Sequence, residues 1–233
     1  MTRTKASAAV VPLAVVLAFV SAPALRGDTL NEPFESASFP PTGWIVRNQS
    51  DAIGTNATCW NHATTSPWVP AVGNGHAAAD FHCTAATNTI SGWLISRPLV
   101  NLQNGNPVSF WTRTAAGRPE FPDRLQVRVC IDTTPDSCGA AGSTGTTSSD
   151  VGGFTLLQLD INPTLTTGVY PVSYTQQNFS LSGLPGSPST GRIAFRYFVT
   201  NGGPTGANSN AITIDQVNVF DNVPVELMTF VVE

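Results

Sequence analysis

Short runs of alternating apolar and polar residues, separated by turn-forming residues, dominate the chain. Within residues 123–132, Leu125, Val127 and Val129 face one way and the polar residues between them face the other. Residues 191–200 repeat this period of two. Such alternation is typical of antiparallel strands with one buried face. Sustained helical periodicity is missing, so the pattern predicts an all-β protein.

Other runs, such as residues 93–95, 108–111 and 154–159, are apolar on both faces. They suit central strands between sheets, or strands whose outer face is covered by a loop. We expect about ten strands, near residues 32–36, 43–48, 75–81, 92–98, 107–114, 124–132, 154–161, 175–181, 191–200 and 211–220. Residues 139–153 and 201–210 are predicted to be surface loops, too short to separate two domains.

The first 24 residues have the features of an export signal. Arg3 and Lys5 precede an apolar stretch at residues 8–20, and residues 22–24 fit the small-x-small rule for cleavage after Ala24. The alternative is a membrane anchor, but the apolar stretch is shorter than a spanning helix requires. We therefore expect a signal peptide at residues 1–24, one β domain at residues 25–222, and an edge strand or tail at residues 223–233.

Charge excludes one class of partner. The formal net charge is −4, and the chain's single lysine, Lys5, lies in the signal segment. Basic residues form no cluster that could bind a phosphate backbone, so nucleic acid is not an expected partner. Beyond the signal, the chain lacks an apolar run long enough to span a membrane. We expect a secreted or surface-attached protein that acts as a monomer.

The four cysteines are Cys59, Cys83, Cys130 and Cys138. An even number in an exported chain favours disulfides, and three pairings are possible. We favour Cys59–Cys83 and Cys130–Cys138 because each pair joins near neighbours. Metal binding is the weaker interpretation, since the CxxC spacing is missing.

The sequence lacks the common motifs of catalysis, including GxSxG, HExxH, the P-loop and GxGxxG after a strand. It also lacks a close pair of acidic residues of the kind that glycoside hydrolysis uses. His62, His76 and His82 are expected to be surface or loop-packing residues. A non-enzyme is therefore favoured, with a lectin-like hydrolase as the alternative.

Acidic residues suggest a calcium site instead. Glu35 is expected in the first strand and Asp215 in the last, and these strands commonly lie side by side in a sandwich. Calcium binds six to eight oxygens, some of them from backbone carbonyls. The predicted site consists of Glu35, Asp215 and Asp80, with Asp51 and Asp123 as possible further ligands.

The last strand changes phase near this site. Ile212 and Ile214 have one parity, whereas Val217 and Val219 have the other. A β-bulge at residues 215–216 would produce this change, and bulges often redirect side chains at functional sites. The alternative is a strand that is buried on both faces.

Five tryptophans are present. Trp44, Trp93 and Trp111 lie in strand-like contexts and are predicted to be core residues. Trp60 and Trp68 lie in a loop-like stretch, where exposed rings could bind sugars or protein partners. Packing beneath the Cys59 loop is the equal alternative for these two.

The opening of the β domain resembles that of the cleaved adhesin and choice-of-anchor J domains. These domains start with a Phe-Glu pair, a short polar gap and then Phe-Pro-x-x-Gly-Trp. Residues 34–35 (FE) and 39–44 (FPPTGW) match this order.

Four later segments are similar to this family in the same order: SGWLISRPLVNL at residues 91–102, VSFWTRT at 108–114, DRLQVRV at 123–129 and AITIDQVNVF at 211–220. The resemblance implies a two-layer antiparallel jelly-roll sandwich, similar also to MAM and lectin-like domains. It implies a non-catalytic, secreted or surface-attached binding role toward glycan or protein. Family members often hold calcium, and Glu35 and Asp215 match their recurrent acidic positions. A structural domain without a ligand is the remaining alternative.

Overall fold

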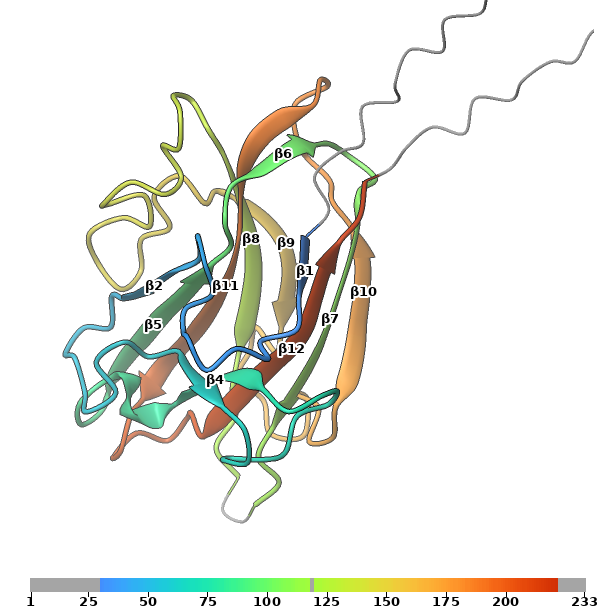
Figure 1. The fold of residues 1–233 in the computed structure, drawn as a ribbon. Helices are drawn as coiled ribbons and strands as arrows, with labels where there is room; N and C mark the ends of the chain where they lie inside the picture. Colours follow the sequence, from blue (N-terminus) through green and yellow to red (C-terminus); the bar gives the residue numbers. More distant parts are fainter. Residues whose placement is uncertain (1–29, 118–119, 222–233) are drawn as a thin grey trace, which may run out of the picture.

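The computed structural model describes residues 30–117 and 120–221, and they form two antiparallel β-sheets packed face to face (Figure 1). The proposed signal peptide and most of the proposed tail lie outside the described residues. One sheet, here called the β12 sheet, has the order β10 (Thr175–Ser180), β7 (Pro107–Thr114), β12 (Ala211–Val219), β4 (His76–Asp80) and β3 (Asn61–Ala63), with β1 (Leu30–Glu32) also paired to β12.

The second sheet, here called the β11 sheet, lies behind the first. Its order is β2 (Ile45–Asn48), β5 (Asn88–Ile95), β11 (Ser189–Gly202), β8 (Leu125–Ile131) and β9 (Leu156–Ile161), with β6 (Leu99–Leu102) also paired to β11. A 3-10 turn, η1 (Phe81–Cys83), follows β4. In the described part of the chain, none of the helical segments is long and apolar enough to cross a membrane. The predicted all-β, two-layer fold is confirmed.

All ten predicted strands are present, and two further short ones, β3 and β6, were not expected. β3 is only three residues long and reads Asn-His-Ala, which carries no strand signal. β6 follows Pro98 directly, and the expected strand near residues 92–98 ends at Ile95 instead. β3 pairs with β4 at the edge of the β12 sheet, and β6 pairs with the first residues of β11.

The core lies between the sheets and follows the predicted alternation. Leu125, Val127 and Val129 of β8 are fully buried. Across the sandwich, the rings of Phe110 and Phe195 meet edge to face, with centroids 5.1 Å apart. Apolar residues at every second position of the strands therefore meet between the layers, which is the main source of stability in such a fold.

The first and last strands are neighbours, as predicted: Leu30 pairs with Val219 and Glu32 with Val217. The register of β12 against β7 shifts between Asp215 and Asn218, and Gln216 has a φ of 49°. The predicted bulge at residues 215–216 is therefore present. Because it adds one residue, apolar side chains on both sides of it point into the core.

The outer face of the β11 sheet is covered by the loop of residues 132–155, which encloses a second apolar cluster of Trp93, Ile95, Cys130, Cys138, Phe154 and Ala194. Residues 139–153 were predicted to form a surface loop. The prediction was incomplete, because this loop also covers an apolar cluster. Arginines hold the loop in place: Arg47 donates to Gly139 O and Ser143 Oγ, each over 2.6 Å. Arg128 donates to Phe154 O over 3.1 Å.

Arg196 is the most buried of these arginines, with 1% of its surface exposed. Its guanidinium lies 4.0 Å from the ring centroid of Phe198 and 4.7 Å from that of Trp93, and it donates to Ser148 O. Burial lowers the pKa of Arg196 to about 9, and the charges of Arg128 and Arg124 add to this effect. A buried charge that makes both ring contacts and hydrogen bonds ties the loop to the sheet.

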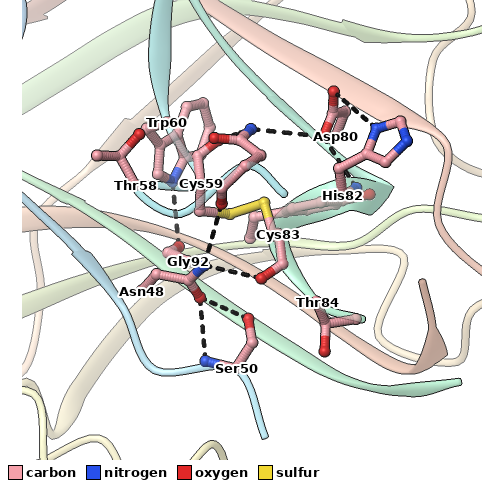
Figure 2. The surroundings of a disulfide bond; sticks show 12 residues. Asn48, Ser50, Thr58, Cys59, Trp60, Asp80, His82, Cys83, Thr84 and Gly92 are labelled. Carbon is pink, nitrogen blue, oxygen red and sulfur yellow. Dashed lines mark hydrogen bonds and ion pairs between the residues drawn. A yellow bond between two sulfur atoms is a disulfide. The ribbon is translucent and has the colours of Figure 1, made fainter. Parts of the chain in front are cut away.

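Both favoured disulfides are present, Cys59–Cys83 and Cys130–Cys138. Figure 2 shows the first, which joins the residues just before β3 and just after β4. Gly92 lies against it, and a Cβ at this position would approach Cys59 Sγ to 2.1 Å. Close packing on the adjacent strand β5 therefore requires glycine.

Trp60 packs beneath the same disulfide. It is completely buried, and its Nε1 donates to Gly92 O over 3.1 Å (Figure 2). The prediction that Trp60 offers an exposed ring to a ligand was therefore wrong, and the packing alternative holds. A buried indole needs an acceptor for its N–H, and the β5 carbonyl provides one.

Removal of the disulfides should cost stability in proportion to the loops that they close. The pairs span 24 and 8 residues. On the chain-entropy model, Cys59→Ala/Cys83→Ala should lower the free energy of unfolding by about 3.5 kcal/mol and Cys130→Ala/Cys138→Ala by about 2.5 kcal/mol. Urea denaturation of both double variants measures the difference, and a larger loss for the second pair would contradict this ranking.

Candidate functional site

The outer face of the β12 sheet carries a row of side chains that point away from the core. Trp111 and Arg113 of β7 lie on this face, since the alternate residues between them are buried. Across the sheet, Arg113 is paired with Thr213 and Trp111 with Asp215. Directly opposed residues in neighbouring strands share a face, so these four side chains lie together.

Arg113 lies at the centre of this face, between two aromatic rings. Its Cζ is 4.4 Å from the ring centroid of Trp68 and 5.5 Å from that of Tyr174. Its Nη2 donates to Val172 O over 2.7 Å. The hydroxyl of Thr213 donates to the Tyr174 hydroxyl over 3.3 Å. We call Trp68, Trp111, Arg113 and Tyr174 the aromatic–arginine face.

All four side chains of the aromatic–arginine face are partly exposed. Three apolar residues of the neighbouring loops are more open to solvent: Val69 is 66% exposed, Val72 46% and Val172 41%. Exposed rings bordered by apolar side chains are typical of a surface that binds a ligand or partner.

Polar side chains extend the row toward the other end of β7. Trp111 is paired with Gln176, and Ser109 with both Asn178 and Asn218. Gln176 and Asn178 are exposed. The face therefore combines flat rings with amide and hydroxyl groups, which can both donate and accept hydrogen bonds.

The two carboxylates proposed for calcium both contact the loop that precedes β4. Asp215 Oδ2 accepts from Val72 N over 3.0 Å, and Glu35 accepts from Asn74 N over 3.0 Å and 2.9 Å with its two oxygens. Glu35 follows β1 rather than lying in it, which corrects its expected place. The sequence therefore identified two acidic residues, far apart along the chain, that meet one loop.

Asp215 is completely buried at the bulge. Burial raises its pKa to about 6, hydrogen bonds from Val72 and Gln216 oppose this, and the charge of Glu35 raises it further. A carboxylate held away from water beside a second one is the arrangement that produces such a shift.

Asp80 lies away from this pair. It is opposite Ala211 on β12, four residues before Asp215, which corresponds to roughly 13 Å along a strand. Asp80 instead accepts from His82 N over 2.9 Å (Figure 2). It lines a recess together with Asn56 and Asn61. Within residues 30–117 and 120–221, no three His, Cys, Asp or Glu side chains are grouped as a metal site.

The other two acidic residues considered as ligands serve different roles. Asp123 is completely buried and accepts from the hydroxyls of Thr114 and Tyr197 and from Asn210 N. Asp51 accepts from Thr89 N at the margin of the β11 sheet. Among the described residues, the hydrogen-bond partners of Asp51 and Asp123 differ from those of Glu35 and Asp215.

His76 is buried at the start of β4, next to the loop that reaches Asp215. Neither ring nitrogen has a hydrogen-bond partner among the described residues. Burial lowers its pKa to about 4, and the nearby His62 adds to this effect. His76 is therefore neutral at pH 7, and it is a buried strand residue rather than the surface or loop-packing residue that was expected.

Sequence reasoning identified Trp68 but missed Arg113 and Tyr174. It also assigned Trp111 to the core, and this was wrong because Trp111 lies on the outer face with part of its ring exposed. Val108 and Phe110, which are buried, set the inward parity of β7 and leave Trp111 and Arg113 outward. The parity of this strand is the signal that could have found both residues.

Comparison with solved structures agrees with this architecture. The K1 cleaved adhesin domain of Lys-gingipain from Porphyromonas gingivalis W83 is 21% identical, with a TM-score of 0.52, over 84% of this chain and 99% of that domain. The chain has the fold of a cleaved adhesin domain. The family resemblance in the sequence is thus confirmed at the level of the fold.

Two further structures share less with the chain. The K3 cleaved adhesin domain of Lys-gingipain from the same organism is 19% identical, with a TM-score of 0.48, over 82% of this chain and 98% of that domain. The CBM22-1 xylan-binding domain of Xyn10C from Paenibacillus barcinonensis is 16% identical, with a TM-score of 0.40, over 84% and 95% of the two chains. No protein-family model and no curated protein matches the sequence.

The raised pKa of Asp215 predicts a pH dependence of stability. A carboxyl whose pKa is about 6 when folded and near 3.9 when unfolded contributes stability that is present below pH 4 and is lost as the pH rises to about 6. Asp215→Asn should remove this loss. Relative to the variant, wild type should lose about 1–2 kcal/mol of unfolding free energy over that range.

Urea denaturation at several pH values between about 3.5 and 7 measures this difference. Asp160→Asn is a suitable control, because Asp160 pairs with Arg124 on the other sheet. Parallel pH profiles for wild type and Asp215→Asn would contradict the prediction.

Proposed function

We propose that the protein is a non-catalytic, extracellular binding domain that recognises a glycan through its aromatic–arginine face. The observation that carries this proposal is the packing of Arg113 between the rings of Trp68 and Tyr174 on the outside of the β12 sheet. Flat rings bind the apolar faces of sugars, and the guanidinium and nearby amides can bind their hydroxyls.

The chemistry of the polar groups on this face supports binding rather than catalysis. Gln176, Asn178 and Ser109 carry amides and a hydroxyl, which do not exchange protons near neutral pH. Glycoside hydrolysis requires an acid and a base on either side of the scissile bond. Here the nearest carboxyl, Asp215, is buried and accepts hydrogen bonds from the backbone.

A protein partner is the second candidate. The exposed side chains of Val69, Val72 and Val172 border the rings, and such apolar borders are common in protein interfaces. The amide-rich extension of the face favours a glycan, because amides suit the many hydroxyls of a sugar. The two disulfides support an oxidising, extracellular location, and we propose that the protein acts there as a monomer.

Replacement of the rings tests the binding face. Trp68→Ala and Tyr174→Ala should each weaken glycan binding about tenfold, since a ring contact contributes about 0.5–2 kcal/mol. The measurement is titration calorimetry with glycans selected by screening wild type on an oligosaccharide array. Leu157→Ala is a matched control, because Leu157 is 45% exposed on the other sheet.

If wild type binds none of the glycans on the array, the proposal fails. Capture of a protein partner that is lost in Trp68→Ala would instead favour the second candidate. Activity on a polysaccharide that is lost in Asp215→Asn would favour a hydrolase.

We also propose that calcium binds between Glu35 and Asp215. The support is that both carboxylates reach the loop of residues 71–74 and that the charge of Glu35 raises the pKa of Asp215. A cation would relieve this repulsion, and loop carbonyls could supply the further oxygens that calcium requires.

Excess calcium at pH 7 should therefore raise the melting temperature of wild type, and a chelator should reverse the rise. Glu35→Gln should abolish the calcium response. Asp80→Asn should leave it intact, because Asp80 lies away from the pair. An unchanged melting temperature of wild type at millimolar calcium would remove the calcium proposal without affecting the binding face.

A further inference from the structure

Within the described residues, the charge of Arg113 has no acidic partner at ion-pair distance. On the other sheet, Arg124 donates to Asp160 over 2.8 Å and 2.6 Å and Arg192 to Asp136 over 2.9 Å, whereas Arg47, Arg128 and Arg196 donate to carbonyls of the loop that covers them. Arg113 makes no ion pair with any residue in the described ranges. An arginine with a partly exposed, unpaired charge in a chain of net charge −4 suggests a role outside the fold itself.

We propose that Arg113 makes this face selective for glycans that carry a carboxylate, such as those containing uronic or sialic acid residues. The proposal rests on the proposed function and specifies its ligand class. The guanidinium is planar and presents N–H groups in a fork that matches the two oxygens of a carboxylate.

The surroundings of Arg113 leave one edge of the guanidinium available. Among the described residues, Nη2 donates to Val172 O over 2.7 Å and Nε donates weakly to Thr114 O over 3.4 Å, so the edge formed by Nη1 and the second N–H of Nη2 remains for a ligand. Both contacts are to neutral carbonyls, so the charge is not neutralised. The rings of Trp68 and Tyr174 restrict the guanidinium, which lowers the entropy lost when it binds a ligand.

The two nearby carboxylates accept hydrogen bonds from the backbone and form no ion pair with Arg113. Asp215 is completely buried and accepts from Val72 N and Gln216 N, while both oxygens of Glu35 accept from Asn74 N. They are therefore occupied by the backbone. A carboxylate that docks on Arg113 meets its exposed side, where the described neighbours are aromatic and aliphatic side chains.

The remainder of the row favours a sugar chain over an acidic peptide. From Arg113 the outward positions of β7 continue through Trp111 to Ser109, a distance of roughly 13 Å along the strand. Gln176 and Asn178 flank these positions. This length exceeds one sugar ring, so the acidic residue can bind Arg113 while neighbouring sugars contact Trp111 and the amides. The face also lies in mid-sheet, where a peptide cannot add as an edge strand.

The test uses pairs of oligosaccharides that differ only in the carboxylate. Tri-galacturonic acid is compared with its methyl ester, and sialyllactose with its methyl ester, by titration calorimetry on the whole protein. Wild type should bind at least one acidic member about 10- to 100-fold more tightly than its neutral counterpart. Arg113→Gln should lose this preference, so that it binds the acidic and the neutral member with affinities within about threefold of each other. Arg113→Lys should keep only part of the preference.

Arg124→Gln is the charge-matched control, because it removes one positive charge from the other sheet and should leave the preference unchanged. Melting curves check the folding of each variant. If Arg113→Gln does not fold, the salt dependence of wild type gives a second measure: raising the salt from about 0.05 to 0.5 M should weaken binding of the acidic member only.

The outcomes separate this proposal from the proposed function. Equal affinity for acidic and neutral members overturns the carboxylate preference but leaves glycan binding intact. Equally tight binding of a polyglutamate peptide, lost in Arg113→Gln, overturns the choice of a glycan. Failure to bind any glycan, acidic or neutral, overturns the proposed function itself.

Discussion

The bulge in β12 is the constraint on which the rest of the architecture depends. β12 pairs with β7 on one side, and on the other it pairs first with β4, up to Ile214, and then with β1, from Val217 onward. A regular strand would have turned Val217 and Val219 outward, because each extra residue reverses the face. One added residue keeps both halves of the strand in the core. It also places Asp215 on the outer face at the point where the loop of residues 71–74 crosses.

Arginine has different roles on the two sheets. On the β11 sheet, Arg47, Arg128 and Arg196 donate to backbone carbonyls of the loop of residues 132–155 and hold it over a second apolar cluster. On the β12 sheet, Arg113 stacks between two rings without an ion partner among the described residues. The guanidinium suits both tasks because it keeps its charge when partly buried and binds with both its faces and its edge. One outer face is therefore closed by the protein's own loop, and the other is exposed in part, along β7 and β10.

Much of the fold could be predicted from the sequence, because alternation and disulfide spacing are local signals. Three local signals gave correct predictions of a strand, a bulge and two disulfides: the parity of Leu125–Ile131, the phase change around Asp215 and the spacing of the cysteines. Alternation in β8 did not show, however, that its polar face would be covered. That cover depends on contacts between Arg128 and a carbonyl 26 positions away, which no local pattern contains.

The candidate site was less predictable for the same reason. Trp60 and Trp68 lie eight positions apart in one irregular stretch, yet the first is completely buried and the second is partly exposed. Neither neighbourhood has the alternation of a strand, so only the course of the chain separates the two tryptophans. The parity of β7 could have placed Arg113 on the outer face, but its role depends on rings from two other loops, which no pattern within β7 contains.

The position of the Cys59–Cys83 disulfide has an evolutionary consequence. It joins the two ends of the β3–β4 hairpin, and the connection between these strands carries Trp68. The ends of the hairpin are thus fixed covalently, whereas its tip supplies one wall of the binding face. Changes in the length or composition of that tip leave the Cys59–Cys83 disulfide and the core between the sheets unchanged. Related proteins could therefore diverge in ligand preference by exchanging one short segment, and the same segment is a natural place to graft new recognition onto this scaffold.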